Sequence, residues 1–230
     1  MKLKPAGRFL ERHVKIALIG AGDVGSTLAR AWAKKGHDVF FGVRDPKNDK
    51  TRQLVQSLGA HAQAGTVAEA AAFGEVVVLA TPWGAAEAAI RAAGDLRGKM
   101  LIDCTNPLKP DDSGLELGFS TSAAEQVAKW AKGAKTFKAF NTTGSNNMAN
   151  PVIDNIRTVM FVCGDDEAVK PTVLQLVADV GFDAVDAGKL VIARLLEPWA
   201  MLWIHLALTG SAGREFGFAL LRRDSSWRVT

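Results

Sequence analysis

A glycine-rich segment near the start of the chain constrains its fold more than any other feature. Residues Gly20–Gly25 fit the pattern G-x-G-x-x-G, directly follow the apolar run Val14–Ile19, and lead into Val24–Lys35, whose apolar residues recur at helical spacing. In such a strand, turn and helix, the glycines permit a tight turn, close approach of a pyrophosphate, and packing of helix on strand. The segment therefore predicts a dinucleotide-binding fold, with the phosphates at the start of the helix. We expect Asp23 to cap that helix.

The rest of the chain repeats the alternation of apolar runs and alanine-rich helical stretches. The expected strands are Val14–Ile19, Asp38–Phe41, Glu75–Ala80, Lys99–Cys104, Lys135–Phe140, Arg157–Cys163 and Asp183–Asp186. The expected helices are Val24–Lys35, Asp49–Leu58, Val67–Phe73, Gly84–Ala93, Ser122–Lys132 and Asp166–Val180. This alternation predicts an α/β protein with a doubly wound Rossmann parallel sheet and a short C-terminal helical appendage. We divide the chain into an N-terminal arm (1–13), a dinucleotide-binding Rossmann domain (14–188), and a C-terminal helical segment (189–230) for dimerisation and the acceptor site.

Charge and cysteine content exclude several classes of function. The formal net charge is +4, with 28 Lys and Arg against 24 Asp and Glu, and no run of basic residues is present for binding nucleic acid. A small anionic ligand suits this charge better. Cys104 and Cys163 lie far apart in apolar runs, with no further Cys or His at metal-ligand spacing. We therefore expect reduced thiols, a cytoplasmic protein and no metal site.

One apolar run, Leu190–Leu208, is long enough to cross a membrane, but it contains Arg194, Glu197, Pro198 and His205. Each charge near the bilayer centre costs about 2.5 to 3.5 kcal/mol, so we predict a buried helix and no membrane partner. The first dozen residues lack the apolar core of a signal peptide. Since the helix is apolar on nearly every side, we expect it to contribute to a homodimer interface.

The end of the second expected strand bears on the choice between NADP and NAD. NAD-binding folds place an acidic residue about 20 positions beyond the glycines, where NADP-binding folds place a cation for the 2′-phosphate. Gly42 occupies the usual acidic position, and Arg44 follows it. We therefore expect NADP, although a later end to the strand would bring Asp45 to the ribose and favour NAD. Alternatively, Arg44 and Asp45 are ordinary solvated charges at a strand end.

Several separated motifs resemble those of one family. Residues 14–25, together with Gly36-His37-Asp38-Val39 and Gly42-Val43-Arg44, resemble the NADPH-dependent deazaflavin coenzyme (F-420) reductases. Segments Ala80–Trp83, Asp103–Pro107, Lys138–Thr142, Leu195–Pro198 and Phe218–Arg222 look like later parts of that family. The resemblance implies NADP(H) as cofactor and a deazaflavin as co-substrate. The family commonly has Gly-Ser-Arg where this chain has Gly42-Val43-Arg44, so one hydroxyl contact to the 2′-phosphate is missing.

Polar loops after three further strands complete the expected site, because the carboxyl ends of parallel strands share one edge of a sheet. The residues expected to contact the cofactor are Gly20, Ala21, Gly22, Asp23, Val24, Gly25, Val43, Arg44, Ala80, Thr81, Pro82, Asn106, Pro107 and Asn141. Those expected near the acceptor are Trp83, Thr142, Met201 and His205. For Trp83 we favour the buried face of the next helix over contact with the acceptor, and for His205 we favour packing in the core or between subunits over a place in the site. The polar loop residues are also common in ordinary turns.

The chain contains no tyrosine, so mechanisms that use a phenol as proton donor are excluded. No histidine or lysine is obvious at the expected rim, and we assign no catalytic residue. Hydride exchange between two redox rings needs positioning more than proton transfer. The favoured function is therefore a reductase that passes hydride between NADP(H) and a deazaflavin or flavin-like small-molecule acceptor. The alternatives are an NADPH-dependent reductase of a small imine or carbonyl compound, and a non-enzymatic NADP(H) sensor.

Overall fold

The structure is a computed structural model that describes residues 13–221 apart from 112 and 211, so the expected N-terminal arm lies almost entirely outside the described residues. The main sheet is made of β1 (Lys15–Ile19), β2 (Asp38–Gly42), β3 (Ala62–Gly65), β4 (Val76–Leu79), β5 (Met100–Asp103), β6 (Lys135–Lys138), β9 (Val159–Gly164) and β10 (Asp183–Gly188). A small hairpin joins β7 (Val152–Ile153) to β8 (Ile156–Arg157). The helices are α1 (Asp23–Lys34), α2 (Asp49–Leu58), α3 (Val67–Phe73), α4 (Trp83–Ala93), α5 (Ala123–Trp130), α6 (Ser145–Ala149), α7 (Lys170–Val180) and α8 (Ala193–Leu208).

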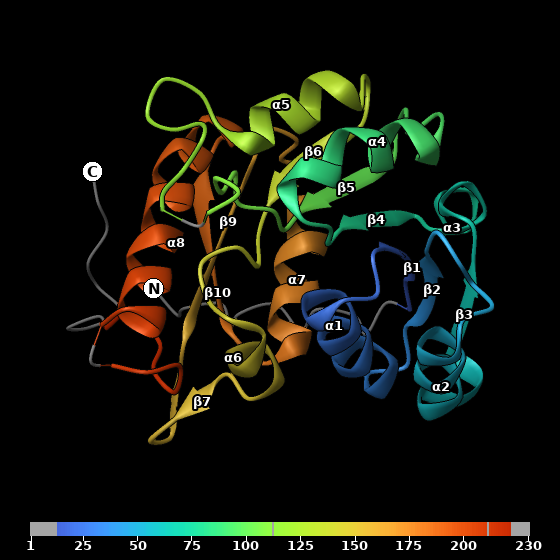
Figure 1. Ribbon diagram of the computed structural model, residues 1–230, viewed down its shortest axis with the longest axis horizontal. Coiled ribbons are helices and arrows are strands. Elements are labelled where there is room, and N and C mark those ends of the chain that lie inside the picture. The colour runs from blue at the N-terminus through green and yellow to red at the C-terminus, as the bar shows by residue number, and fades with distance from the viewer. Residues whose placement is uncertain (1–12, 112, 211, 222–230) are drawn as a thin grey trace, which may run out of the picture.

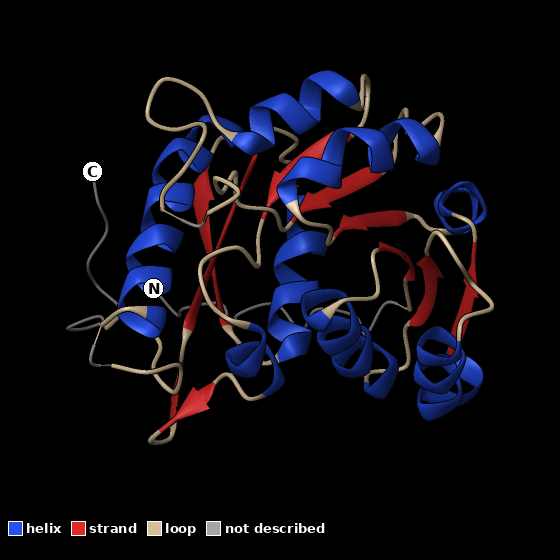
Figure 2. Cartoon of the chain, in the orientation of Figure 1, coloured by secondary structure: helices blue, strands red, loops and turns tan. Residues whose placement is uncertain are grey.

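Helices cover both faces of the eight-stranded sheet, whose order is β10-β9-β6-β5-β4-β1-β2-β3 (Figures 1 and 2). The side chains of β1 alternate between the two faces, as the pleat requires. Ile16 and Leu18 join the core under α1 and α7, whereas Ala17 and Ile19 join the core under α3, α4 and α5. The chain thus forms the doubly wound α/β Rossmann fold that its sequence predicts.

Two strands run against the predicted direction. β1 to β6 are mutually parallel, but β9 pairs with β6 in the antiparallel sense, and β10 runs parallel to β9. The sheet is therefore mostly parallel, as predicted, with β9 and β10 reversed at this edge. A parallel neighbour requires a crossover, usually a full helix. Between β6 and β9 the chain instead contains the five-residue α6 and the β7–β8 hairpin, so it returns in the opposite direction.

The C-terminal helix α8 packs beside β9 and α5. Among the described residues, one helical stretch, Leu190–Leu208, is long and apolar enough to cross a membrane by length and composition alone. Its inner face is part of the protein core, since Leu196, Ala200 and Trp203 are buried there. Its outer face exposes apolar side chains, namely Val191, Leu195, Trp199, Leu202 and Leu208.

Candidate functional site

The glycine loop between β1 and α1 has the conformation that its sequence requires. Gly20 has a φ of +108°, and a Cβ placed on it would lie 2.5 Å from the carbonyl oxygen of Ala80. A Cβ on Gly25 would overlap the carbonyl oxygen of Gly20. Gly22 differs, because no atom of the described residues lies within 4 Å of the position its Cβ would take. The loop is therefore closed toward the sheet and open above Gly22, as a cradle for a phosphate requires.

The start of α1 presents backbone amides rather than a side-chain cap. Gly22 is the N-cap residue and makes no capping hydrogen bond through a side chain. The prediction that Asp23 caps the helix is wrong, because Asp23 is the first helical residue, and it is exposed. The first amides of a helix lack intrahelical acceptors, and the helix dipole favours an anion beside them. Ala21 and Val24 lie half-buried on either side of this open end.

The loop after β2 separates the two charges that bear on cofactor choice. β2 ends at Gly42, where a Cβ would lie 2.9 Å from Val67 Cα, so an acidic side chain has no room there. Arg44 is exposed, and it forms no ion pair or hydrogen bond with the residues that the structure describes. The Asp45 carboxylate instead accepts a hydrogen bond from the Lys47 amide (3.0 Å), which closes a local turn. Arg44 therefore has no partner among the described residues, and the end of β2 is held beside the glycine loop because the Gly20 amide donates to the Gly42 carbonyl (3.1 Å). Val43, which precedes Arg44, is half-buried.

The loops after β4, β5 and β6 continue the sheet hydrogen bonding past the strand ends. The Ala80 amide donates to the Ile19 carbonyl (2.9 Å), and the Cys104 amide donates to the Leu79 carbonyl (3.1 Å). The two loops are therefore held beside the glycine loop. Thr81 follows Ala80, and its Oγ1 is buried without a hydrogen-bond partner among the described residues. Pro82 is the N-cap residue of α4 and is exposed at the same rim.

Two asparagines join the loops after β5 and β6. Asn141 Nδ2 donates to Asn106 Oδ1 (3.0 Å), and Asn106 Nδ2 donates to the Asn141 carbonyl (2.8 Å). Asn141 Nδ2 also donates to the Leu196 carbonyl of α8 (3.2 Å). Asn141 Oδ1 is buried without a partner in the described part of the chain. A turn at Phe140, whose φ is +61°, brings Asn141 into this position, a conformation that costs free energy in a residue other than glycine.

Of the remaining predicted residues, some lie in these loops and others turn away from them. Pro107 is buried at the base of the loop after β5. Trp83 begins α4, stacks on Trp130 and donates through Nε1 to Glu116 Oε2 (2.9 Å), so it lies on the helix face that we favoured for it. The Thr142 hydroxyl is turned into the core toward Met160 Sδ (3.6 Å).

Two predicted acceptor residues lie on α8. Met201 is half-buried, whereas His205 is exposed near the end of the helix, where its Nδ1 is 2.9 Å from Thr209 Oγ1. The structure thus joins Asn106, Asn141 and the glycine loop along one edge. It does not place His205 in the core.

A buried ion cluster that was not predicted from the sequence lies directly beneath these loops. Lys138 Nζ lies 2.7 Å from Asp103 Oδ2 and 2.8 Å from Glu197 Oε1, and all three side chains are fully buried. Burial alone would lower the pKa of Lys138, but the two carboxylates raise it above its ordinary value, so the amine is charged. Lys138 sits in β6 among apolar residues, and this charged residue within an expected strand was the available signal.

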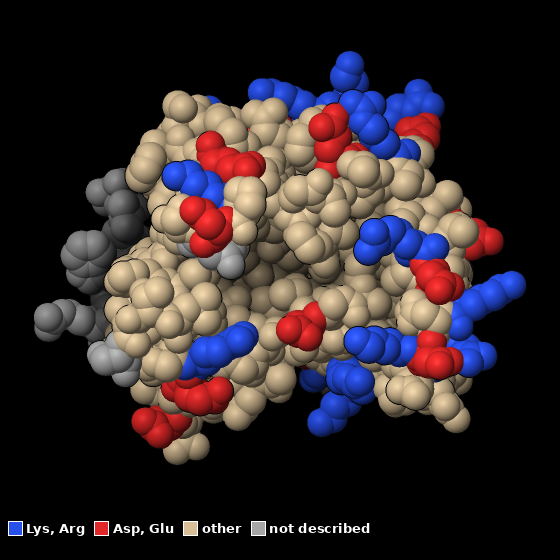
Figure 3. Space-filling model, viewed as in Figure 1, with Lys and Arg blue, Asp and Glu red and all other residues tan. Residues whose placement is uncertain are grey.

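Figure 3 shows that the molecule is hollowed at the centre of one face, between α8 on the left and α1 at the lower right. β4 and β5 point their carboxyl ends toward this region in Figure 1. The walls of the hollow consist mostly of residues other than Lys, Arg, Asp and Glu. The edge of the sheet that carries the glycine loop therefore opens on a largely uncharged space, which suits a flat ring.

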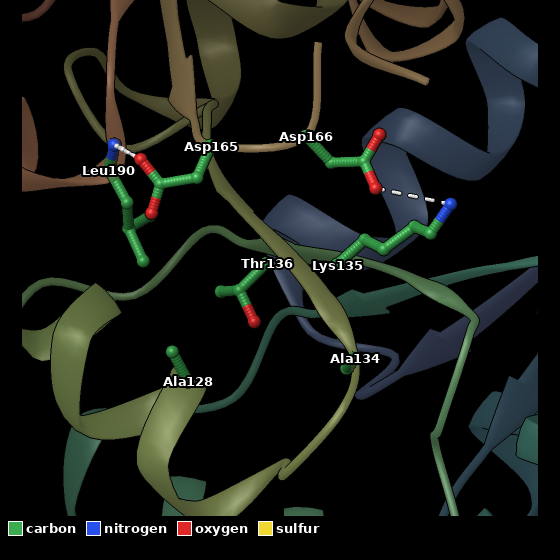
Figure 4. A pocket seen from close by; sticks show the side chains of 7 residues that line it. All are labelled: Ala128, Ala134, Lys135, Thr136, Asp165, Asp166 and Leu190. Carbon is green, nitrogen blue, oxygen red and sulfur yellow. Dashed lines mark hydrogen bonds and ion pairs between the residues drawn. The ribbon is translucent and has the colours of Figure 1, made fainter. Parts of the chain in front are cut away.

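A second cavity of about 350 Å³ lies at the opposite edge of the sheet (Figure 4). It is lined by Ala128, Ala134, Lys135, Thr136, Asp165, Asp166 and Leu190. Its charged groups already have partners within the protein: Lys135 Nζ pairs with Asp166 Oδ2 (3.1 Å), and Asp165 Oδ1 accepts from the Leu190 amide (3.1 Å). Lys135 begins β6, so this cavity is separated from the glycine loop by the length of the strands.

Comparison with known proteins gives a consistent set of similarities. A family model described as NADP oxidoreductase, coenzyme F420-dependent, matches residues 15–107. The metalloreductase STEAP3 of Rattus norvegicus is 31% identical over 183 residues, which make up 80% of this chain. The chain spans 36% of the length of that curated relative.

Solved structures share the fold over most of the chain. A candidate F420-dependent NADP-reductase from Arthrobacter sp. FB24 is 32% identical, with a TM-score of 0.82 over 91% of this chain and 100% of that chain. A hypothetical protein from Sinorhizobium meliloti is 26% identical, with a TM-score of 0.71 over 80% of this chain and 89% of that chain. A reductive aminase from Aspergillus terreus, solved with NADPH, is 22% identical, with a TM-score of 0.65 over 86% of this chain and 64% of that chain.

Proposed function

Because the chain belongs to the family of coenzyme F420-dependent NADP oxidoreductases, we propose that it transfers a hydride between NADP(H) and a deazaflavin or flavin-like acceptor. The observation that carries this proposal is the arrangement at the carboxyl edge of the sheet. There the exposed Arg44 follows β2, the open glycine cradle follows β1, and the uncharged hollow lies by the ends of β4 and β5, which is the order of these strands in the sheet. This order matches the 2′-phosphate, the pyrophosphate and the nicotinamide of an extended dinucleotide.

The residues of the site fit NADP(H) at each of these positions. The space above Gly22 and the amides of Asp23 and Val24 would hold the pyrophosphate. Arg44 would bind the 2′-phosphate, and the absence of room for an acidic side chain at Gly42 disfavours NAD. The buried hydroxyl of Thr81 has no partner among the described residues, so it is available to a polar group of the ligand.

The chemistry follows from what these groups can and cannot do. Bound NADPH supplies a hydride from its nicotinamide ring. The loops after β4 and β5 would orient that ring through their backbone and amide groups. α8 would cover one side of the hollow and exclude water. Thr81, Asn106 and Asn141 offer amide and hydroxyl groups rather than an acid or base, which suits transfer between two rings better than reduction of a carbonyl, where an alkoxide must be protonated.

A stopped-flow experiment tests the proposed acceptor. The purified protein is mixed with NADPH and oxidised coenzyme F420, and the absorbance of the deazaflavin is followed, with FMN, a cyclic imine, a small ketone and a chelated ferric salt in parallel. We expect saturable reduction of F420 that exceeds that of the other acceptors. Saturable turnover of the imine or ketone alone would favour the alternative reductase. NADPH binding with no turnover of any acceptor would favour a sensor.

We also propose that the protein is a cytoplasmic homodimer. Both cysteines, Cys104 and Cys163, are free and buried, as in a reducing compartment. The outer face of α8 exposes Leu195 and Leu202 at 62% and 48% of their surface, and a second copy of α8 would cover them.

A further inference from the structure

The buried ion cluster Asp103–Lys138–Glu197 joins four elements beneath the candidate site. Lys138 Nζ donates to Asp103 Oδ2, to Glu197 Oε1 and to the Thr105 carbonyl (2.6 Å). An ammonium group has three hydrogen atoms, so its donors are fully used. Asp103 and Lys138 end β5 and β6, and Glu197 lies in α8. The cluster therefore ties a helix from the end of the chain to two central strands.

Glu197 also links α8 to α5. Its Oε2 accepts from the Ala123 amide (2.9 Å), and its Oε1 accepts from the Ala124 amide (3.2 Å), at the first turn of α5. Two carboxylates and one ammonium leave the cluster with one negative charge. The positive end of the α5 dipole lies against Glu197 and offsets that charge. Each polar atom of the Glu197 carboxylate is thus engaged.

The residues beside this cluster are those that line the candidate site. Asn106 follows Thr105 in the chain, and Asn141 lies three residues beyond Lys138. Asn141 donates to the carbonyl of Leu196, which is adjacent to Glu197. About two turns further along α8, Trp203 packs on Gly144, where a Cβ would overlap the indole ring. The position of α8 and that of the asparagine pair are therefore set together.

We propose that Asp103, Lys138 and Glu197 are positioning residues that hold α8 and the Asn106–Asn141 pair in register for hydride transfer. Only one part of this inference, the effect on the rate of hydride transfer, rests on the proposed function. A buried ion pair contributes little net stability compared with apolar packing, but it specifies one geometry, because any displacement leaves a charge unpaired. The cluster is not a proton relay, since Lys138 is fully buried and its three donors are engaged.

Two variants test this role. Glu197→Gln keeps the shape of the side chain and removes its charge. The double variant K138M/E197Q removes the ion pair and leaves Asp103 as the sole charge, so the net charge of the cluster is unchanged. Lys170→Met is the matched control, because Lys170 is also buried and paired, with Glu167 (2.6 Å) and Asp186 (3.2 Å), but it lies away from the strand-end loops.

Three measurements separate positioning from stability. The first is hydrogen–deuterium exchange of the α8 amides. The second is calorimetric titration with 2′,5′-ADP, which occupies only the adenosine half of the site, and with NADPH. The third is kcat and KM for coenzyme F420. We expect both cluster variants to exchange faster in α8, to bind 2′,5′-ADP like the parent, and to lose about tenfold or more in kcat or in NADPH affinity.

The control variant should lower the melting temperature and leave all three readouts at parent values. The proposal is overturned if the cluster variants show parent exchange in α8, or if their NADPH affinity and kcat match those of the parent. If the parent binds neither 2′,5′-ADP nor NADPH, the proposed function fails, and the exchange measurement alone decides whether the cluster holds α8. If the parent binds NADPH but does not turn over F420, the NADPH affinity of the cluster variants, compared with that of the parent, decides whether the cluster positions the site.

Discussion

At the scale of single residues, the site depends on small differences between neighbouring positions. Gly20 and Gly22 belong to the same loop, yet a side chain on Gly20 would meet the Ala80 carbonyl, and one on Gly22 would meet only open space. The first glycine is required by the fold, and the second by the ligand that the fold is proposed to hold. Similarly, Arg44 has no partner in the described part of the chain, whereas the adjacent Asp45 is engaged in a turn. Two predictions follow from these contrasts.

Gly22→Ala should weaken NADP(H) binding by tenfold or more, because its methyl group enters the space proposed for the pyrophosphate. Since the φ of Gly22 is −75° and no atom lies near the new Cβ, the free energy of unfolding should change by less than about 1 kcal/mol. Gly20→Ala, at a φ of +108°, should instead destabilise the protein. Titration with NADPH and urea unfolding of both variants measure these effects. Equal loss of stability in the two variants would contradict this assignment.

Arg44→Ala should weaken binding of NADPH and 2′,5′-ADP by about tenfold to a hundredfold, since a charge-assisted contact to phosphate contributes about 1.5 to 3 kcal/mol. Binding of NADH should be nearly unchanged, because NADH lacks the 2′-phosphate. Asp45→Asn is the control and should leave the ratio of the two affinities as it is. Calorimetric titrations with both nucleotides provide the measurement. A parallel loss for NADH would show that Arg44 does not read the 2′-phosphate.

At the scale of elements, the sequence predicts helices and strands well where local signals determine them. The bounds of α2 and α3 were predicted correctly because side chains cap both helices: Asn48 accepts from the Thr51 amide, and Thr66 forms a capping box with Glu69. β3 was not among the expected strands, since Ala62–Gly65 lacks the β-branched and aromatic residues typical of strands. The residues of β9 do not indicate the direction of this strand. Its direction depends on the segment of chain that connects β6 to β9.

In the candidate site, too, local sequence signals predict some of the residues and not others. The glycine loop and Arg44 could be selected from spacing along the chain. The Asp103–Lys138–Glu197 cluster could not, because its members lie far apart in the sequence and meet through tertiary packing of α8. Thr142 was expected near the acceptor because it is a polar residue after a strand. Its side chain is instead turned into the core.

The contact between α7 and the start of β2 gives a prediction for pH. His37 Nε2 lies 3.1 Å from Asp179 Oδ2, and both side chains are largely buried. Burial would raise the pKa of Asp179, but hydrogen bonds from His37 and Gln175 hold it below its ordinary value of 3.8. Because the folded-state pKa is the lower one, the carboxylate stabilises the fold above pH 3.8, and this stabilisation is lost as the pH falls through the folded-state value.

Asp179→Asn should therefore lower the free energy of unfolding by about 1 kcal/mol at pH 7. The difference from the parent should shrink as the pH falls below about 4, where the unfolded state of the parent is protonated first and the folded state follows at its lower pKa. Urea unfolding at several pH values measures this. Asp49→Asn, in an exposed pair with Arg52, is the control and should have a much smaller effect. A pH-independent difference would show that the charge of Asp179 is not responsible.

At the scale of the whole molecule, α8 has two faces with different tasks. Its inner face carries Glu197 and Trp203 into the fold, and its outer face exposes Leu195, Trp199 and Leu202. α8 is therefore as apolar as a membrane span for two separate reasons: one apolar face packs in the core, and the other is exposed. Helices with one apolar face in the core and another exposed commonly pair with a second copy.

Leu202→Glu should convert the proposed homodimer to a monomer, because it places a charge in the interface. Sedimentation of the parent should give twice the mass of one chain, and sedimentation of the variant should give the single mass. Phe119→Glu is the control, because Phe119 is 79% exposed but lies in the loop before α5. A parent that sediments as a monomer at all concentrations would refute the dimer.

The packing of Trp203 on Gly144 and the position of Trp83 at the start of α4 have an optical consequence. The chain has six tryptophans and no tyrosine, so its ultraviolet emission comes from indole rings alone. Two of these rings lie on elements that border the strand-end loops. Indole emission overlaps the absorption of reduced nicotinamide but not that of its oxidised form. The protein therefore carries its own spectroscopic reporter, which distinguishes the two redox states of a bound dinucleotide without any label.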